Sequence, residues 1–410
     1  MDFVPIMSTL KRHKTAAALI ALEIALSCAI VANAVFVIRE RLDRMSQPSG
    51  IVVTELIQIE LEGIGRAGSE PSTRDEDMAA LRAIPGVRSV AATNQVPYGM
   101  SSWNTSVNLE PDQMQPILNG ASFYGSEDLL ETLGLRLVSG RGLEPDEYQQ
   151  YEALVERGAE GAVPSVVITA SMAGRLFPDG DAVGRTVYVW SDQPTRIVGV
   201  VEHLQRPGDY FGPSDREYSM LLPVTAPMEY GDRYVLRVDP ERREEILAGA
   251  VDALLEIEPD RIVSEESTTT IEQLREEFFQ QDRAMAWLLV AVCVALLAVT
   301  AAGIVGLASF WVQQRSRQIG VRRAVGATRG QILRYFQTEN FLLATIGIVL
   351  GMALAYAINA LLMERYELAR LPWQFLPIGA VTVWLLGQLA VLGPALRASA
   401  VPPAVATRSV

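Results

Sequence analysis

The stretch RSRQIGVRRAVGATRG, Arg315 to Gly330, carries five arginines and no acidic residue. It lies between two strongly apolar segments, residues 284–312 and 341–362, in a chain whose formal net charge is −13. Dense positive charge between two apolar segments predicts a loop on the cytoplasmic face of a membrane. Positive charge alone does not explain the particular order of residues in this loop.

The negative charge of the chain is concentrated in residues 40–283, which hold 43 acidic residues against 21 arginines. The rest of the chain holds 14 lysines and arginines and 5 acidic residues. An acidic block bracketed by basic, apolar ends is typical of a membrane protein. It argues against a nucleic-acid partner, so lipid is the expected surroundings of the apolar ends.

Four apolar segments are long enough to cross a bilayer, which needs about 20 residues. They are residues 15–38, 284–312, 341–362 and 376–396. The first could instead be a signal peptide, because it has a basic start and an A-x-A stretch at Ala32–Ala34. Its length and Glu23 within it favour a retained span. The fourth is the weakest, since Pro377, Gln388 and Pro394 interrupt it.

The basic residues near the span ends fall on one side of the membrane if there are four spans. The N-terminal segment 1–14, the hairpin 313–340 and the tail 397–410 are then cytoplasmic, and the turn 363–375 lies outside. The predicted fold class is therefore an α+β membrane protein with four transmembrane helices. A large α/β extracytoplasmic domain, residues 39–267, is inserted between the first and second helices, followed by a stalk, residues 268–283.

The inserted domain repeats one pattern near its two ends. Residues 51–61 alternate like a half-buried strand, and a helical stretch and a second strand follow. Residues 233–238 form a comparable strand, with Asp239 and Pro240 starting a helix that ends before Pro259. Two strand–helix–strand units predict a split α/β sandwich, with an inserted subdomain at roughly 112–228. In that subdomain, Ser126 is the predicted cap of a helix.

The composition excludes several kinds of chemistry. Both lysines, Lys11 and Lys14, are N-terminal, so no G-x-x-x-x-G-K-[ST] phosphate loop exists in this sequence. With 2 histidines and 2 cysteines, a histidine- or cysteine-based metal site is not expected. His203 with Asp209 and Ser214 can be drawn as a triad, but no nucleophile motif accompanies them, which favours a surface histidine. We expect no catalytic, cofactor or metal site.

The stalk runs into the second span without an internal proline or glycine between Thr268 and Gly303. Ile271, Leu274 and Phe278 follow helical spacing. The sequence predicts one continuous helix from about Thr268 to Val325, a rod that projects on both sides of the bilayer. The alternative is two helices with a hinge at the membrane surface.

The basic stretch has the local signals of a capped helical corner. Gly326 suits a helix stop, and Thr328 with Gln331 forms a T-x-x-Q capping box that starts the next helix. Arg322 and Arg323 lie in the last turn before the stop, where cations suit the helix dipole. A stiff basic corner predicts a contact for another protein. Its expected contact residues are Arg322, Arg323, Ala324, Gly326, Ala327, Thr328 and Arg329.

Four further candidate positions lie inside or near the spans. Gly347 and Gly351 form a G-x-x-x-G pattern, which permits close helix approach, although glycine is common in membrane helices. Glu23 and Glu339 are acidic residues in or beside apolar segments, where a carboxylate is costly and is expected to face protein or reach the interface. Glu23 has two open interpretations, a functional role or a hydrogen bond to Ser or Thr on a neighbouring helix.

The sequence resembles the FtsX-like permease domain of ABC transporters of the MacB type. The family pattern R-E-I-G-x-R-[RK]-A-x-G-A appears here as Arg317–Ala327, with Glu339 before the next span and the stretch PALRASAVPPAVATR at Pro394–Arg408. The stretches LRAIPGVRSV and LGLRLVSGRGL match the style of the MacB periplasmic core domain. Gln318 stands where the family usually has Glu, which leaves the corner more positive than usual.

The resemblance implies a permease in a bacterial inner membrane, with N- and C-termini cytoplasmic and its large domain periplasmic. It implies a separate ABC ATPase subunit that binds ATP, and a dimer with a second permease copy or a paralogue. It also implies mechanotransmission and efflux of a peptide, antibiotic or other small amphiphile, with a periplasmic adaptor and outer-membrane channel as further partners. The alternatives are an FtsX-like regulator of a periplasmic cell-wall hydrolase and a lipoprotein-extracting permease.

Overall fold

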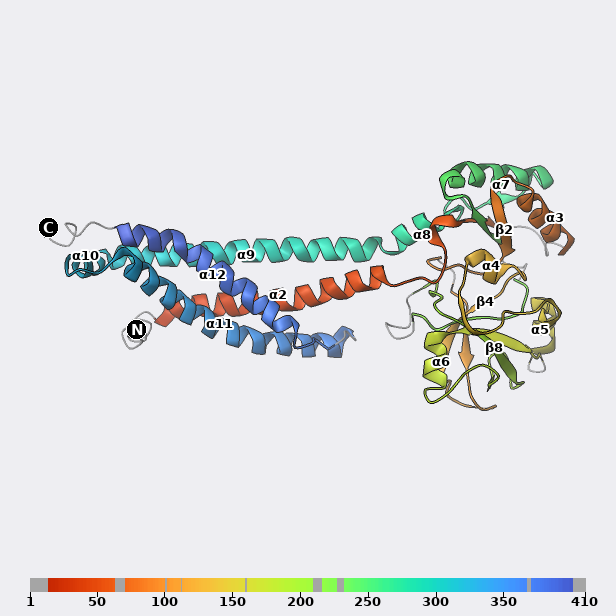
Figure 1. The fold of residues 1–410 in the computed structure, drawn as a ribbon, viewed down its shortest axis with the longest axis horizontal. Coiled ribbons are helices and arrows are strands. Elements are labelled where there is room, and N and C mark those ends of the chain that lie inside the picture. Colours follow the sequence, from red (N-terminus) through yellow and green to blue (C-terminus); the bar gives the residue numbers. More distant parts are fainter. Residues whose placement is uncertain are drawn as a thin grey trace. The chain divides into compact units, whose positions relative to one another are not determined.

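The structure is a computed structural model that describes residues 14–62, 71–99, 102–111, 113–158, 161–208, 216–226, 232–366 and 370–400. The chain divides into two compact units. The helical unit combines Met1–Ser46 with Gln281–Val410, and the mixed unit is Gln47–Gln280. Figure 1 shows long helices in the first and sheets flanked by short helices in the second. Residues 1–13 and 401–410, which belong to the two terminal segments predicted to be cytoplasmic, lie outside the described residues.

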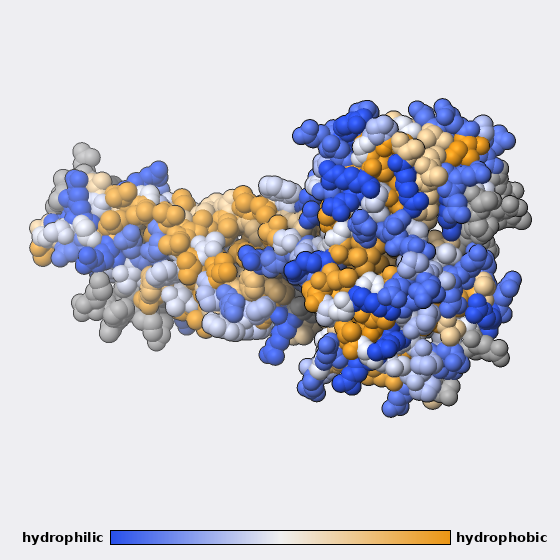
Figure 2. All heavy atoms as spheres, turned by 45° about the vertical axis from the view of Figure 1, so that its right-hand side comes forward, coloured by the Kyte–Doolittle hydropathy of each residue, from blue (hydrophilic) through white to orange (hydrophobic). Residues whose placement is uncertain are grey.

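Four helices among the described residues are long and apolar enough to cross a membrane. They contain the four predicted spans and extend beyond them: α2 (Lys14–Ser46), α9 (Gln280–Gln314), α11 (Arg329–Tyr366) and α12 (Phe375–Ala400). A short helix, α10 (Ser316–Ala324), separates α9 from α11. Apolar side chains cover much of the visible surface of the helical unit, whereas the mixed unit is largely hydrophilic outside (Figure 2). The fold class is as predicted.

Three of these helices, α2, α11 and α12, make close backbone contacts at glycines. A Cβ added at Gly347 of α11 would lie 2.8 Å from the carbonyl oxygen of Ala21, and one at Gly351 would lie 2.6 Å from that of Ala25. On α12, a Cβ at Gly379 would lie 3.2 Å from the carbonyl oxygen of Cys28. Small residues therefore let α11 and α12 approach the backbone of α2.

The prediction of one continuous helix from Thr268 to Val325 is wrong. One non-helical residue, Phe279, separates α8 (Ile271–Phe278) from α9, and a second irregular residue, Arg315, separates α9 from α10. At Phe279 the cause lies in packing, because Phe278 and Phe279 both contact the ring of Tyr98, with centroid distances of 5.4 and 5.8 Å. Adjacent residues of a regular helix point about 100° apart and cannot readily share one partner.

The irregularity at Arg315 is a bend rather than a gap. The Arg315 N–H still donates to the carbonyl of Trp311 at 3.0 Å, and the Ile319 N–H donates to the carbonyl of Arg315 at 2.9 Å. Its backbone angles, φ −104° and ψ 9°, depart from the helical values. The helix axis can therefore change direction here while most of its hydrogen bonds are kept.

The first sheet of the mixed unit confirms the two predicted strand–helix–strand units. Its strands lie in the order β11-β1-β10-β2, and β12 also pairs with β1. The elements are β1 (Leu56–Glu62), α3 (Pro71–Arg82), β2 (Val87–Ala92), β10 (Arg233–Val238), α7 (Arg243–Ile257), β11 (Ile262–Val263) and β12 (Thr269–Thr270). Strands β1 and β10 are antiparallel, with Ile57 opposite Leu236. Helices α3 and α7 cover one face with Leu81, Ile246 and Leu254.

The second sheet is inserted between β2 and β10, with strand order β3-β4-β9-β6-β8-β5 and β7 paired to β8. Its strands are β3 (Asn104–Val107), β4 (Leu118–Phe123), β5 (Leu137–Gly140), β6 (Ser165–Thr169), β7 (Thr186–Val187), β8 (Thr195–Val201) and β9 (Ser219–Leu221). Its helices are α4 (Leu129–Leu133), α5 (Tyr151–Arg157) and α6 (Ala170–Leu176). The strand β3 begins before residue 112, where the inserted subdomain was expected to start.

Local capping signals in the mixed unit are partly as predicted. The Asp239 side chain accepts from the Glu241 N–H, but the turn it caps is a 3-10 helix, Pro240–Arg242, that precedes α7. The prediction that Ser126 caps a helix is wrong, because α4 begins after Asp128 and the Ser126 hydroxyl instead accepts from the Ala92 N–H at 3.2 Å. The Ser126 hydroxyl thus joins the segment that follows β4 of the second sheet to the end of β2 in the first sheet.

We expect Gly351→Ala to destabilise the helical unit by about 1–3 kcal/mol, because the new methyl group would overlap the Ala25 carbonyl. The measurement is the thermal unfolding midpoint of the full chain in detergent. The control is Gly306→Ala on α9, where nothing lies within 4 Å of an added Cβ. An equal midpoint for Gly351→Ala and the wild type would show that the close approach does not matter.

Candidate coupling site

The basic stretch folds as the capped corner that its sequence predicts. Helix α10 ends at Ala324 with Arg322 and Arg323 in its last turn, and Gly326 has φ +105°, a value that favours glycine. The Thr328 N–H donates to Gln331 Oε1 at 2.9 Å, and the Gln331 N–H donates to Thr328 Oγ1 at 3.3 Å. This reciprocal pair is the predicted capping box, and α11 begins at the next residue, Arg329.

The corner presents an exposed surface that is both basic and apolar. Val325 is 85% exposed and Val321, one turn earlier, is 49% exposed. Arg322 and Arg329 are exposed beside them, and the Arg322 guanidinium lies 5.2 Å from the centre of the Tyr335 ring. Val321 and Val325 are not among the contact residues predicted from the sequence. Their signal was an i, i+4 apolar pair offset from the buried Ile319.

The inner side of the corner is fixed to the rest of the helical unit by an apolar cluster. Its buried members come from four helices and include Val312 of α9, Ile319, Ile332, Phe336 and Ala395. Because these residues hold α10 against α11 and α12, the corner is a packed element of the unit. A force applied at its exposed surface would therefore reach these helices.

A buried ion pair joins the bend at Arg315 to α11. Arg315 Nη1 lies 3.0 Å from Glu339 Oε2 and 3.2 Å from Oε1, and Glu339 is only 1% exposed. The Arg315 guanidinium also lies 5.6 Å from the centre of the Trp311 ring. Glu339 therefore faces protein, as expected of an acidic residue beside an apolar span. Sequence analysis counted Arg315 only as a topology marker.

The acidic residue inside the first span, Glu23, is half-buried against α9. A Cβ added at Gly303 would lie 2.7 Å from Glu23 Oε2, so this glycine makes the space that the carboxylate occupies. One turn further along α2, the hydroxyls of Ser27 and Thr300 lie 2.7 Å apart. The sequence left open a hydrogen bond from Glu23 to a Ser or Thr of a neighbouring helix. Among the described residues, the hydroxyl of Thr300 bonds to Ser27 and makes no hydrogen bond with Glu23. Polar contacts thus run along the α2–α9 boundary.

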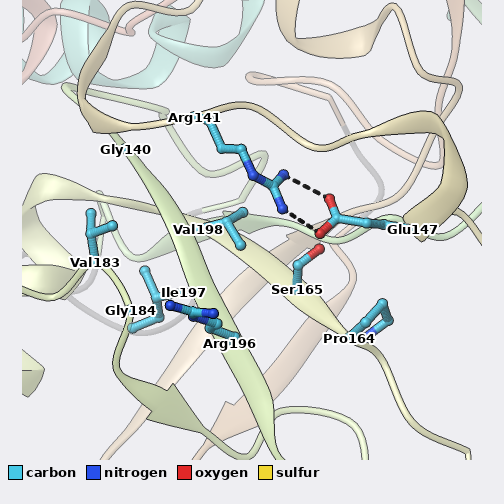
Figure 3. Close-up of a pocket in the computed structure, with 10 residues that line it drawn as sticks. All are labelled: Gly140, Arg141, Glu147, Pro164, Ser165, Val183, Gly184, Arg196, Ile197 and Val198. Carbon is cyan, nitrogen blue, oxygen red and sulfur yellow. Dashed lines mark hydrogen bonds and ion pairs between the residues drawn. The ribbon is translucent and has the colours of Figure 1, made fainter.

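The mixed unit contains a pocket of about 430 Å³ on the β5–β8 side of the second sheet (Figure 3). Arg141 and Glu147 form a two-point ion pair there, with nitrogen–oxygen distances of 2.7 and 2.9 Å. These two charges satisfy each other. The Arg141 guanidinium holds the pKa of Glu147 below its usual value of 4.5, because its hydrogen bonds favour the ionised carboxylate. The pair therefore braces the loop after β5.

A metal cluster and a triad at His203 are the two chemical sites considered from the sequence. No group of three or more His, Cys, Asp or Glu residues in the described part of the chain could hold a metal ion. His203 Nδ1 lies 2.9 Å from Glu217 Oε1. The other two residues of the sketched triad, Asp209 and Ser214, lie outside the described residues, so the structure does not test it.

The sequence matches two family descriptions that together cover most of the chain. Residues 15–254 match the MacB-like periplasmic core domain, and residues 290–403 match the FtsX-like permease C-terminal domain. The chain belongs to the family of ABC transporter permeases that carry these two domains. The four apolar helices are the transmembrane helices of such a permease, and the mixed unit corresponds to the core domain.

Particular relatives resemble the chain at modest identity. The macrolide export ATP-binding/permease protein MacB of Chromobacterium violaceum is 27% identical over 84% of this chain and 53% of that protein. The ABC transporter permease YvrN of Bacillus subtilis, which is uncharacterized, is 24% identical over 83% of this chain and 80% of that protein. The chain spans about half the length of the MacB relatives that it matches.

Among solved structures, the periplasmic region of MacB from Actinobacillus actinomycetemcomitans is 14% identical, with a TM-score of 0.32. The match covers 57% of this chain and 97% of that chain.

We expect Glu339→Gln to lower the stability of the helical unit by about 3 kcal/mol, because the Arg315 charge would stay buried without its partner. The thermal unfolding midpoint of the full chain in detergent measures this. The control is Arg317→Gln at an exposed position of α10, two residues after Arg315, which should change stability by less than about 0.5 kcal/mol. The double variant Arg315→Met/Glu339→Leu should recover part of the loss. If Glu339→Gln and Arg317→Gln unfold alike, the ion pair contributes nothing.

At neutral pH, we expect Glu147→Gln to cost the mixed unit about 1 kcal/mol, because the two-point pair with Arg141 is lost. A pKa lowered in the folded state contributes stability above the usual value of 4.5, and that stability disappears as pH falls through the folded value. Wild type and variant should therefore converge below pH 4.5. Urea unfolding of the full chain, followed by hydrogen exchange of β6 and β8, tests this. Asp146→Asn in the same turn is the control, and a gap that persists in acid would contradict it.

Proposed function

We propose that the chain is the membrane subunit of an ABC exporter in a bacterial inner membrane, driven by a separate ATPase subunit. The basic corner would bind that ATPase on the cytoplasmic side, and the mixed unit would lie in the periplasm. The orientation follows from the arginines of the corner, since positive charge accumulates in cytoplasmic loops. The chain itself would bind no nucleotide, because its sequence lacks a phosphate-loop lysine.

The single observation that carries this proposal is the exposed, rigid corner with an apolar centre and a basic rim. A loop that only marks topology needs arginines but no capping box and no exposed valine. Val325 and Val321 supply the kind of apolar contact found at the centre of protein interfaces, and the surrounding arginines supply the charged rim. The corner is packed against α11 and α12, so movement of a bound ATPase would be transmitted to the helices.

The remaining parts of the proposal come from the relatives. MacB proteins are named for macrolide export, and PvdT of Pseudomonas aeruginosa, 24% identical over 70% of this chain, is named for pyoverdine export. By analogy, the cargo here would be a small amphiphile or peptide in the periplasm. The permease would act as a dimer, with a periplasmic adaptor and an outer-membrane channel as further partners. ATP-driven closure of the ATPase pair would move the helices and change the mixed units.

We expect Val325→Glu to reduce ATPase binding by at least about tenfold, because it puts a charge into the apolar centre of the contact. The Arg322→Glu/Arg323→Glu double variant should do the same by reversing the rim. The measurement is recovery of the ATPase with tagged permease from detergent-solubilised membranes, followed by ATP hydrolysis of the recovered complex.

The matched control is Val138→Glu, the same change at a valine of the mixed unit that is 47% exposed. It should leave recovery unchanged. Equal recovery of the ATPase with Val325→Glu, with the double variant and with the wild type would remove the corner from the interface. Failure of the wild type to retain any ATPase would contradict the proposed function as a whole.

A further inference from the structure

Helix α9 is held to the helical unit less closely than the other three spans. The backbones of α2, α11 and α12 approach one another closely, and α9 has no comparable approach to any of them among the described residues. Its buried residues form one narrow stripe that includes Ala286, Cys293 and Thr300, seven residues apart. The large buried side chains of α9, Ile304, Trp311 and Val312, all lie nearer the corner. Between Gln280 and Thr300 the buried side chains are small or polar, so polar contacts contribute more to fixing this end of α9.

The outer end of α9 has a buried ion cluster with α2. Asp282, in the first turn of α9, is 4% exposed. Arg41 Nη1 lies 2.6 Å from its Oδ1, and Arg44 Nη1 lies 3.2 Å from its Oδ2. Arg41 and Arg44 are three residues apart and therefore share one face of α2. An acidic residue also suits the N-terminal turn of a helix.

This cluster lies where the chain passes between the two units. The mixed unit is joined to the helical unit twice, after Ser46 and before Gln281. Arg44 stands two residues before the first crossing, and Asp282 stands directly after the second. Of the two helices at these crossings, α9 continues into the corner through α10, whereas α2 has no direct chain connection to the corner. A displacement that begins at the corner therefore reaches the second crossing through the chain, and the first one only through contacts with α2.

We infer that Asp282, Arg41 and Arg44 form a clamp that makes both crossings into the mixed unit move together. Arg41, Arg44 and Asp282 are positioning residues. They carry the displacement of α9 to the outer end of α2, so that the mixed unit is moved as a body instead of being sheared between its two attachments. This inference rests on the proposed function for the source of the displacement. The clamp itself can be tested without it.

The first experiment measures the clamp directly in the full chain in lipid nanodiscs. Spin labels are placed at Leu42 and Met285, two exposed positions that flank the cluster, in a background with Cys28 and Cys293 replaced by serine. We expect a narrow distance distribution for the parent chain. Asp282→Asn should widen it about twofold, because a buried carboxylate that pairs with two arginines is removed.

The matched control is Asp43→Asn. Asp43 is paired with Arg39 at 3.0 Å on the exposed side of the same helix, so its loss should leave the distribution unchanged. The charge-exchanged variant Arg41→Asp/Arg44→Asp/Asp282→Arg should restore the narrow distribution, which separates loss of the clamp from general misfolding. A distribution for Asp282→Asn as narrow as that of the parent would overturn the inference.

The second experiment uses the complex with the ATPase recovered by the wild-type chain. Addition of ATP should change the hydrogen exchange of the mixed unit in the wild type and in Asp43→Asn. In Asp282→Asn that change should fall by at least about fivefold while ATP hydrolysis continues. An unchanged response in Asp282→Asn overturns the clamp. A wild type without any response contradicts the proposed function, and the spin-label result then still decides whether the clamp exists.

Discussion

Close backbone contact at α2 is the constraint on which the helical unit depends. Gly347 and Gly351 of α11 and Gly379 of α12 lie against the α2 backbone, where larger side chains would collide with carbonyl oxygens. In lipid there is no hydrophobic drive to bring helices together, so dispersion contacts and hydrogen bonds must do so. Asn33 of α2 adds such a bond, because its side-chain amide donates to the carbonyl of Ala355 at 3.2 Å. The result is a firm three-helix support.

Helix α9 is held against these three helices in a different way. Its buried apolar side chains, such as Ile304 and Trp311, pack against them, and polar contacts fix it at Asp282, at Thr300 and through Arg315 at the bend that follows it. These polar contacts act at separate points along α9, whereas α11 and α12 approach the backbone of α2 closely at glycines. A helix held in this way can be rotated or shifted in small steps without dismantling the other three. This arrangement suits a helix that joins the corner to the mixed unit.

Features that depend on neighbouring residues could be predicted from the sequence. The capping box at Thr328 and Gln331 and the left-handed Gly326 are local signals, and the structure contains both. Features that depend on distant residues could not be predicted. The break at Phe279 requires Tyr98, and Ser126 failed as a cap because Ala92 competes for its hydroxyl. The partner of Glu339 became visible only when the bend brought Arg315 to it.

The strand order of the second sheet shows the same limit. Strand β9 lies between β4 and β6, so a segment near residue 220 separates two strands that precede it by many residues. The periodicity of the sequence identified most of these strands, but it does not show which strands pair with one another in the sheet. The alternation of β1, in contrast, predicted its buried face, since Ile57, Ile59 and Leu61 all point to the core beneath α3 and α7.

The position of the mixed unit in the chain has a consequence for biogenesis. Helix α2 is synthesised first, yet Thr300, Ala355 and the glycines that cover it come from the last third of the chain. During translation, Ser27 and Asn33 of α2 therefore lack these partners while the more than 200 residues of the mixed unit are synthesised. The helical unit can therefore pack completely around α2 only after α9, α11 and α12 have been synthesised.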